Sequence, residues 1–217
     1  MYKELKENEE ILCLIESGDK NLEILGYTEH SIKHCVKVAK EAERILKVLG
    51  YDKHQAELAK IAGLLHDIGN AINRNRHAEY GAILANQILE KTELDIRDRL
   101  AIVSAIGNHD ESTGGAKDAI SAALIIADKT DVRRNRVRTK DKAQFDIHDR
   151  VNYAVTGAEL EYLEDKKHIV LKLEIDESIC SMYEYFEIFL GRMLMCRRAA
   201  EILGAKFKLI ANGHKVL

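Results

Sequence analysis

Ala62-Gly-Leu-Leu-His-Asp-Ile-Gly69 ends a segment, residues 53–67, whose side chains are apolar on nearly every side. A helix without a polar face is normally buried. This one ends in His66 and Asp67, and burying such groups without partners costs on the order of 2–7 kcal/mol for a polar group and more for a charge. A divalent transition metal bound by both side chains would remove that cost. The alternative is that Asp67 caps the helix end and His66 is a hydrogen-bonded core residue.

Four other side chains of the same chemical kind lie on apolar faces or ends of neighbouring predicted helices: His34 in 28–49, His77 after the polar loop 68–76, His109 at the end of 95–108, and Asp128 in 117–130. A lone buried histidine is more often a core residue than a ligand. Six such side chains together predict a centre of two metal ions bridged by Asp67. The remaining five would divide as follows: His34, His66 and Asp128 on one ion, His77 and His109 on the other.

The predicted centre suits phosphate chemistry. Two metal ions about 3.5–4 Å apart activate water near neutral pH and neutralise charge on a phosphoryl group. We therefore predict His66 and Asp67 as catalytic residues. A basic run follows Asp128, and its members are Lys129, Arg133, Arg134, Arg136, Arg138 and Lys140. The run is either a solvated face or a patch that holds substrate phosphates through bidentate contacts. In the second case Lys129 and Arg133 are the predicted phosphate-binding residues.

The composition is that of a folded domain. The 217 residues are 46% hydrophobic and 32% charged, with a formal net charge of −3, so we expect no nucleic-acid polymer and no membrane as a partner. No apolar run approaches the roughly 20 residues that span a bilayer, and the charged start, 1–10, is unlike a signal peptide. Four scattered cysteines indicate reduced thiols. We therefore predict a cytoplasmic protein.

Changes of periodicity divide the chain, because it has no proline and no low-complexity linker. We predict an N-terminal helical extension, a helical metal-binding domain and a C-terminal α+β subdomain, over residues 1–27, 28–148 and 149–217. The extension is predicted to break at Gly18. The subdomain is predicted to contain a hairpin, a helix and a last strand pair, over 160–175, 177–203 and 205–217. The fold class is therefore mainly α, with an all-helical core and a small C-terminal α+β part.

Spacing within the helices predicts which side chains face the core. In 95–108 the inward positions are predicted to be Ile96, Leu100, Val103 and Ile106. The aromatic residues and methionines of 177–203, Tyr183 among them, are predicted mainly as core. Any that remain exposed would indicate a homodimer face. His30 lies one turn before His34 on the same side, and its role is left open.

The order of the six predicted ligands resembles that of the HD superfamily of metal-dependent phosphohydrolases, over about residues 28–140. The matching motifs are His34-Cys-Val-Lys-Val-Ala, Leu64-Leu-His-Asp-Ile-Gly69, His77-Ala-Glu-Tyr-Gly-Ala-Ile-Leu84 (the additional histidine of binuclear members), Ala105-Ile-Gly-Asn-His-Asp-Glu111 and Ile126-Ala-Asp-Lys129. In many members a Lys or Arg after the signature pair binds phosphate. Here that position is Asn70, so Lys129 or Arg133 would substitute. The Gly-Tyr-Pro motif of the cyclic-dinucleotide phosphodiesterase branch is absent.

The resemblance implies an all-helical core and hydrolysis of a phosphate ester or anhydride, often of a nucleotide or a related phosphorylated small molecule. It also implies two divalent metal ions, with Fe or Mn first and Mg, Ni, Co or Zn as alternatives. Two other functions stay open. HD-fold di-iron oxygenases resemble this chain in the same six ligands and use dioxygen to cleave a C–C or C–P bond. A non-catalytic nucleotide-sensing or scaffold protein would bind nucleotide without turnover.

Overall fold

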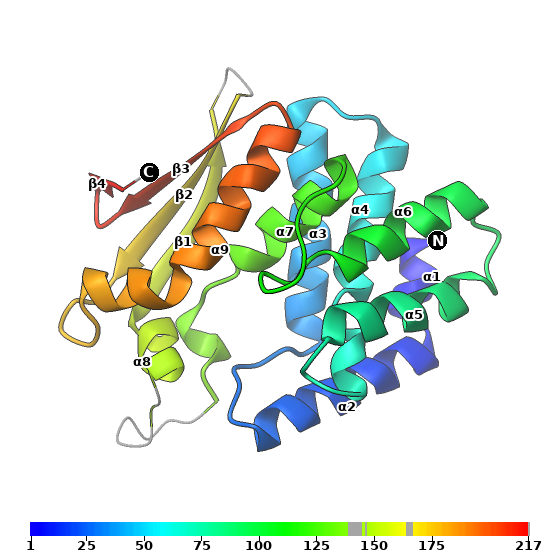
Figure 1. Ribbon diagram of the computed structural model, residues 1–217, viewed down its shortest axis with the longest axis horizontal. Helices are drawn as coiled ribbons and strands as arrows, with labels where there is room; N and C mark the ends of the chain where they lie inside the picture. The colour runs from blue at the N-terminus through cyan, green and yellow to red at the C-terminus, as the bar shows by residue number, and fades with distance from the viewer. Residues whose placement is uncertain (139–144, 146, 164–166, 217) are drawn as a thin grey trace.

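The protein is described by a computed structural model over residues 1–138, 145, 147–163 and 167–216. Its larger part is a group of helices packed around an apolar core (Figure 1). These elements are α1 (Tyr2–Lys6), α2 (Glu9–Ile24), α3 (Ile32–Leu49), α4 (Lys53–Leu65), the 3₁₀ helix η1 (Ile68–Ala71), α5 (His77–Leu89), α6 (Ile96–Gly107), α7 (Ala119–Lys129) and the 3₁₀ helix η2 (Arg134–Arg136). A smaller sheet follows near the C-terminus, which confirms the predicted fold class.

The two helices with almost no polar side chains, α4 and α7, lie at the centre of the helical part. α4 packs against α3, α6 and α7, and the side chains of Ile61, Leu64 and Leu65 are fully shielded from solvent. Gly63 allows α3 to come close, because a Cβ atom at this position would lie 2.7 Å from the Cα of Ala39. The polar ends of α4 and α7 are therefore positioned by close helix packing.

The N-terminal extension differs from the prediction. The chain breaks at Asn8, whose side chain accepts a hydrogen bond from the Ile11 amide and caps α2. α2 then runs through Gly18 without a break. This glycine serves packing, because a Cβ atom there would lie 3.1 Å from the Cβ of Asn70 and from the amide nitrogen of Ala71. Gly18 therefore marks where η1 lies against α2, and the prediction of a helix end was wrong.

Helix α6 confirms two of its four predicted inward positions, because Ile106 is buried and Val103 packs against the core, but Ile96 and Leu100 were wrongly predicted. Ile96 and Leu100 are 58% and 53% exposed, whereas Ile102, Ala105 and Ile106 are buried. The prediction gave weight to large side chains, but α6 packs against α5 at a position where α5 carries a glycine. The Ile106 side chain lies 3.3 Å from the position of a Cβ on the facing Gly81, for example.

The C-terminal part is a four-stranded sheet with two helices. Its elements are α8 (Ile147–Ala154), β1 (Val155–Tyr162), β2 (His168–Ile175), α9 (Met182–Ile202), β3 (Lys206–Ala211) and β4 (His214–Lys215). The strand order is β1-β2-β3-β4, with β2 and β3 parallel and the other two pairs antiparallel. The hairpin and the turn at Asn212-Gly213, both with positive φ, are confirmed, although residues 164–166 of the hairpin turn lie outside the described residues.

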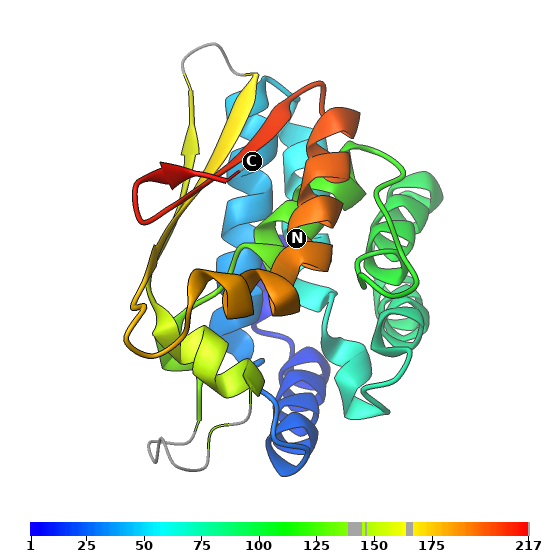
Figure 2. The ribbon, with the colours of Figure 1, turned by 60° about the vertical axis from the view of Figure 1, so that its left-hand side comes forward.

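Helix α9 joins the parallel strands β2 and β3 and connects the sheet to the helical core. It packs against α7 and against β3 (Figure 2). Tyr185, Phe189 and Met193 are buried there, whereas Tyr183 is 76% exposed and was wrongly predicted as core. Among the described residues, the length and apolar content that a bilayer-spanning helix needs are not met by any helix.

Candidate metal centre

The structure brings the six predicted ligands together from separate helix ends. His34 lies in the first turn of α3, His66 directly after α4, Asp67 directly before η1, His77 at the start of α5, His109 two positions after α6, and Asp128 in the last turn of α7. The histidine rings form a continuous row, with neighbouring centroids 5.0–5.2 Å apart from His34 through His66 and His109 to His77. Each polar residue thus ends or begins an apolar helix at one common point.

The four imidazoles are held in one tautomer by their outer nitrogens. The Nδ1 atoms of His66, His77 and His109 each donate to the carbonyl oxygen three residues earlier, at 2.9, 3.1 and 2.6 Å. His34 Nδ1 lies 2.7 Å from Oδ2 of Asp131. Carbonyls and carboxylates only accept hydrogen bonds, so Nδ1 of each ring carries a proton and Nε2 is the nitrogen that faces inward, available to a metal once it is unprotonated.

Asp67 lies between two pairs of histidines. Its Oδ2 atom is 3.6 Å from Nε2 of His34 and 3.2 Å from Nε2 of His66. Its Oδ1 atom is 3.7 Å from Nε2 of His77 and 4.0 Å from Nε2 of His109. The two oxygens of one carboxylate therefore face two different sets of nitrogen ligands.

Asp128 completes the first of these sets. Its Oδ1 atom lies 3.3 Å from Nε2 of His34 and 3.6 Å from Nε2 of His66. The ligand atoms of these three residues lie within 4.8 Å of one another, and so do those of His66, Asp67 and His109. Mixed nitrogen and oxygen ligands at this spacing suit a divalent transition metal.

Unpartnered atoms show that these residues fit a metal. Among the described residues, Nε2 of His34, Nε2 of His66 and Oδ2 of Asp67 are buried without a hydrogen-bond partner. Leaving such atoms unpaired costs about 1–3 kcal/mol each. The Nε2 atoms of His77 and His109 are 3.1 Å apart, and because both nitrogens carry lone pairs they would repel without a cation beside them. A metal ion at each set would satisfy all five atoms.

The electrostatics of the carboxylates favour a bound cation. Burial raises the pKa of Asp67, but the charge and hydrogen bond of His66, together with His30 and His77, hold this pKa well below its usual value. Burial acts on Asp128 in the same direction, and there Lys129, His34 and His66 together keep the pKa low. Both ligands are therefore ionised at neutral pH.

The histidines divide into two classes. Burial lowers the pKa of His66, but Asp67 and Asp128 outweigh burial and raise it to about 10. Burial, helped by His66, lowers the pKa of His109 to about 3, and burial also lowers the pKa of His77. In the absence of metal, His66 thus carries a proton that an incoming cation would replace.

Arg133, a predicted phosphate ligand, lies behind the site instead of in front of it. Its Nε and Nη2 atoms donate to the carboxylate of Asp131 at 2.6 and 2.9 Å, and Lys37 donates to the same carboxylate at 2.6 Å. Asp131 is only 2% exposed and accepts from His34 as well. Arg133 therefore helps to hold the residue that orients His34, and phosphate binding by Arg133 stays a prediction.

Asn70, at the position where many family members carry a cation, holds the bridging carboxylate. Its Nδ2 atom donates to the carbonyl oxygen and to Oδ1 of Asp67, each at 3.0 Å. The cation that lies nearby is Arg74, which the sequence reasoning placed in a polar loop. Its Nη1 atom is 3.5 Å from Nε2 of His77, and its guanidinium lies 5.2 Å from the centre of the Tyr27 ring. A cation one helical turn after Asn70 was the signal for it.

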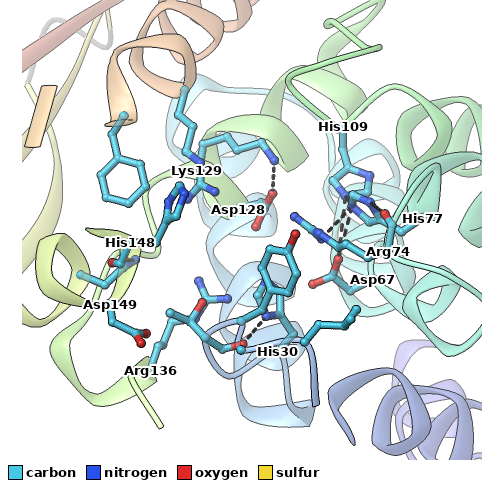
Figure 3. A pocket seen from close by; sticks show the side chains of 17 residues that line it. His30, Asp67, Arg74, His77, His109, Asp128, Lys129, Arg136, His148 and Asp149 are labelled. Atoms are coloured by element: carbon cyan, nitrogen blue, oxygen red, sulfur yellow. Dashed lines mark hydrogen bonds and ion pairs between the residues drawn. The ribbon is translucent and has the colours of Figure 1, made fainter. Parts of the chain in front are cut away.

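A cavity of about 250 Å³ opens over the metal-binding residues. Asp67, His77 and His109 lie on one wall together with Arg74, and Arg136, His148 and Asp149 lie on the opposite one (Figure 3). His30 also lines the cavity; its Nδ1 atom donates to the Thr28 carbonyl at 2.6 Å. The C-terminal residues of the cavity come from α8 and α9 and were not predicted.

The other members of the basic run are hydrogen-bonded. Lys129 lines the cavity and donates to Oδ2 of Asp128 and to Oε2 of Glu111, both at 2.8 Å. Arg136 is buried and donates to backbone carbonyls of Glu29 and Asp131. Most of the run is thus part of the structure around the site and not a solvated face; Lys140 lies outside the described residues. Phosphate binding by Lys129 stays a prediction.

Comparisons with known proteins agree with this geometry. Residues 31–154, more than half of the chain, match the HD domain. The chain is 27% identical over 232 aligned residues to the uncharacterized protein MJ1020 of Methanocaldococcus jannaschii, with 96% of this chain and 83% of that protein covered.

Two further relatives are similar over about half of this chain. Ribonuclease Y of Deinococcus radiodurans is 35% identical over 110 residues, and ribonuclease Y of Enterococcus faecalis is 32% identical over 123 residues. These matches cover 45% and 55% of this chain but 17% and 21% of the two ribonucleases. HD domains bind divalent metals through His and Asp residues and are in general hydrolases. By its match over residues 31–154 and its cluster of His and Asp side chains, the chain belongs to the HD domain family.

Proposed function

We propose that this protein is a metal-dependent phosphohydrolase that cleaves a phosphate ester or anhydride of a small molecule, in the first place a nucleotide. The observation that carries the proposal is the position of Asp67, whose two carboxylate oxygens face different histidine pairs. A bridging carboxylate between two metal sites is the arrangement that in-line phosphoryl displacement uses.

Each residue has a role in this proposal. His34, His66 and Asp128 would hold one ion with Oδ2 of Asp67, and His77 and His109 would hold the other with Oδ1. Two such ions, when bound, activate water and neutralise charge on the phosphoryl group.

Residues around the ligands orient them and the substrate. Asp131 and Asn70 fix the directions of His34 and Asp67 through hydrogen bonds of 2.7 and 3.0 Å. Arg74 and Lys129 on the cavity wall would hold phosphate oxygens.

The cavity supports a small molecule as the substrate. Its volume of about 250 Å³ lies just below the roughly 300–1,000 Å³ that is typical of ligand pockets, so it suits a small ligand better than a large one. The names of the ribonuclease Y relatives indicate action on RNA, but the similarity covers about a fifth of those proteins. A short oligoribonucleotide therefore belongs in the substrate panel as the second candidate, and preferential cleavage of it would replace the small-molecule proposal.

The first experiment is the metal content per chain of anaerobically purified protein, measured by elemental mass spectrometry. We expect two Fe or Mn ions per chain and phosphate release from members of a nucleotide panel. Asp67→Asn should lose both the metal and the phosphate release. Glu187→Gln removes one negative charge at an exposed position of α9 and should retain both. Turnover at the wild-type rate by metal-free Asp67→Asn would overturn the proposal.

The same panel separates the two other functions. Oxygen uptake that follows substrate loss, and that stops when iron is replaced by a redox-inert ion, would identify an oxygenase. Tight nucleotide binding to the fully metallated protein without any product would identify a sensing or scaffold protein. Phosphate release at equal rates with and without oxygen is the result that we expect.

A further inference from the structure

The cavity has a wall that lies outside the HD match. Residues 31–154 match the family, but Phe189 and Arg192 of α9 also line the cavity. α9 packs against α7, the helix that carries Asp128 and Lys129, so this wall is fixed to the metal-binding part. The side chains of this wall can therefore distinguish substrates that the residues common to HD domains would bind equally well.

Arg192 is held in a defined orientation. Its Nε atom donates to Oε1 of Glu111 at 3.0 Å, and its guanidinium carbon lies 4.7 Å from the centre of the Phe189 ring. Glu111 is held in turn, because its other oxygen accepts from Lys129 at 2.8 Å. The two terminal nitrogens of Arg192 have no hydrogen-bond partner among the described residues. They form a pre-oriented pair of donors of the kind that binds two phosphate oxygens.

The charges around Arg192 leave a positive excess. Asp128 belongs to the metal-binding residues, so Glu111 is the one carboxylate that Lys129 and Arg192 share among their described ion pairs. If a bound metal takes up Asp128, two cations then face one carboxylate beside the cavity. An anionic group of the ligand would balance this excess.

We propose that Arg192 is a specificity-determining residue that binds a second phosphate group of the substrate, apart from the phosphate at the metal-binding residues. Glu111 and Lys129 lie between Arg192 and Asp128 in a chain of contacts, and we therefore assign the two ends of this chain to two different phosphate groups. The substrate class is therefore a small molecule with two separate phosphate groups. This inference rests on the proposed phosphohydrolase function, because it assigns the other phosphate to the metal end.

The test uses ligands that a phosphohydrolase cannot cleave. Binding of α,ω-alkylene diphosphonates with one to six carbons to the metallated protein is measured by anaerobic calorimetry, against monophosphonates of the same carbon number. We expect one chain length at which the diphosphonate binds at least tenfold more tightly than its monophosphonate partner. Equal affinities at every length would overturn the proposal.

Variants then assign the advantage to Arg192. Arg192→Gln should reduce the diphosphonate advantage to less than threefold and leave monophosphonate affinity unchanged. The matched control Arg197→Gln removes the same charge from an exposed position of α9 and should keep the full advantage. Arg192→Lys retains the charge next to Glu111 but not the paired donors, so at least a threefold loss is expected. An advantage that survives both Arg192 variants would overturn the proposal, as would an equal loss of monophosphonate binding.

The two proposals can fail separately. If no phosphate is released from any substrate but Arg192→Gln still removes the diphosphonate advantage, the phosphohydrolase function is wrong and the second anion site stands. If phosphate is released and the advantage is absent or independent of Arg192, the function stands and the specificity role is wrong.

Discussion

At the scale of single residues, the outer hydrogen bond of each histidine decides what its inner nitrogen can do. Three of the four imidazoles donate to a carbonyl of their own chain three residues earlier, so their orientation is local. His34 is different, because it depends on Asp131, which lies 97 residues away in sequence. Among the residues that orient the ligands, Asp131 is therefore the one whose substitution we expect to disturb metal binding most.

Asp131→Asn is expected to weaken metal binding about 10- to 100-fold, the usual effect of removing such a partner. An asparagine amide that faces His34 would donate to Nδ1 and move the ring proton to Nε2, where the metal should bind. Metal affinity measured by competition with a chelator tests this, and circular dichroism shows whether the variant is folded. Glu187→Gln is the control, and unchanged affinity in folded Asp131→Asn would show that His34 does not need this partner.

The protonated state of His66 predicts how metal binding depends on pH. The pKa of His66 in the metal-free site is about 10, so the proton is present at pH 6–8 and a cation must displace it. Asp67, Asp128, His77 and His109 are already unprotonated there, because the pKa values of Asp67, Asp128 and His77 are lowered and that of His109 is about 3. Metal affinity should therefore rise with pH, by about tenfold per pH unit for one released proton. Calorimetry in buffers of different ionisation enthalpy counts the protons, and a pH-independent affinity would contradict the assignment.

At the scale of elements, the sequence predicted helices and strands well and their contacts less well. Polar residues at the ends of the apolar helices α4 and α7 predicted where those helices meet. A small residue misled, because Gly18 is a position of close contact with η1 and not a helix end. The parallel pairing of β2 and β3 depends on how α9 packs, which no local pattern encodes. For the same reason Arg192 was missed. Arg74 does lie in the predicted loop, but its position at the cavity was not predicted.

Glycine contacts between η1 and α5 give a prediction at this scale. A Cβ atom on Gly69 would lie 2.0 Å from the carbonyl oxygen of His77 and 2.4 Å from the amide nitrogen of Gly81. Gly69→Ala must therefore push η1 away from α5, and a loss of about 1–3 kcal/mol in the free energy of unfolding is expected. Urea unfolding measures this loss, and metal affinity should fall with it because both elements adjoin ligands.

Gly191→Ala is the matched control for that substitution. Gly191 also lies in a helix, α9, but a Cβ atom there would meet nothing within 4 Å. The same change should therefore stabilise the protein by about 0.5–1 kcal/mol through helix propensity. If both alanine variants have equal stability, the close contact at Gly69 does not constrain the fold.

At the scale of the whole molecule, the ligands connect α3, α4, α5, α6 and α7 at one point. A metal ion that binds the folded state and not the unfolded chain stabilises the whole domain by about 2.7 kcal/mol at a hundredfold excess over its dissociation constant. For a chain of this size the melting temperature should then rise by about 5–11 °C. Thermal unfolding with added Mn²⁺ or Fe²⁺ tests this, and Asp67→Asn should show a much smaller rise. An equal rise in both proteins would place the stabilising ion elsewhere.

The distribution of the ligands along the chain also sets an order of events during biosynthesis. Asp128 follows His34 by 94 positions, and at translation rates of about 5–20 residues per second the two are made roughly 5–19 s apart. Until α7 has left the ribosome, the nascent chain presents histidines without the carboxylate that completes their set. We therefore expect the choice of ion to be made late in folding. It would depend on which metal ions are available once Asp128 has been synthesised.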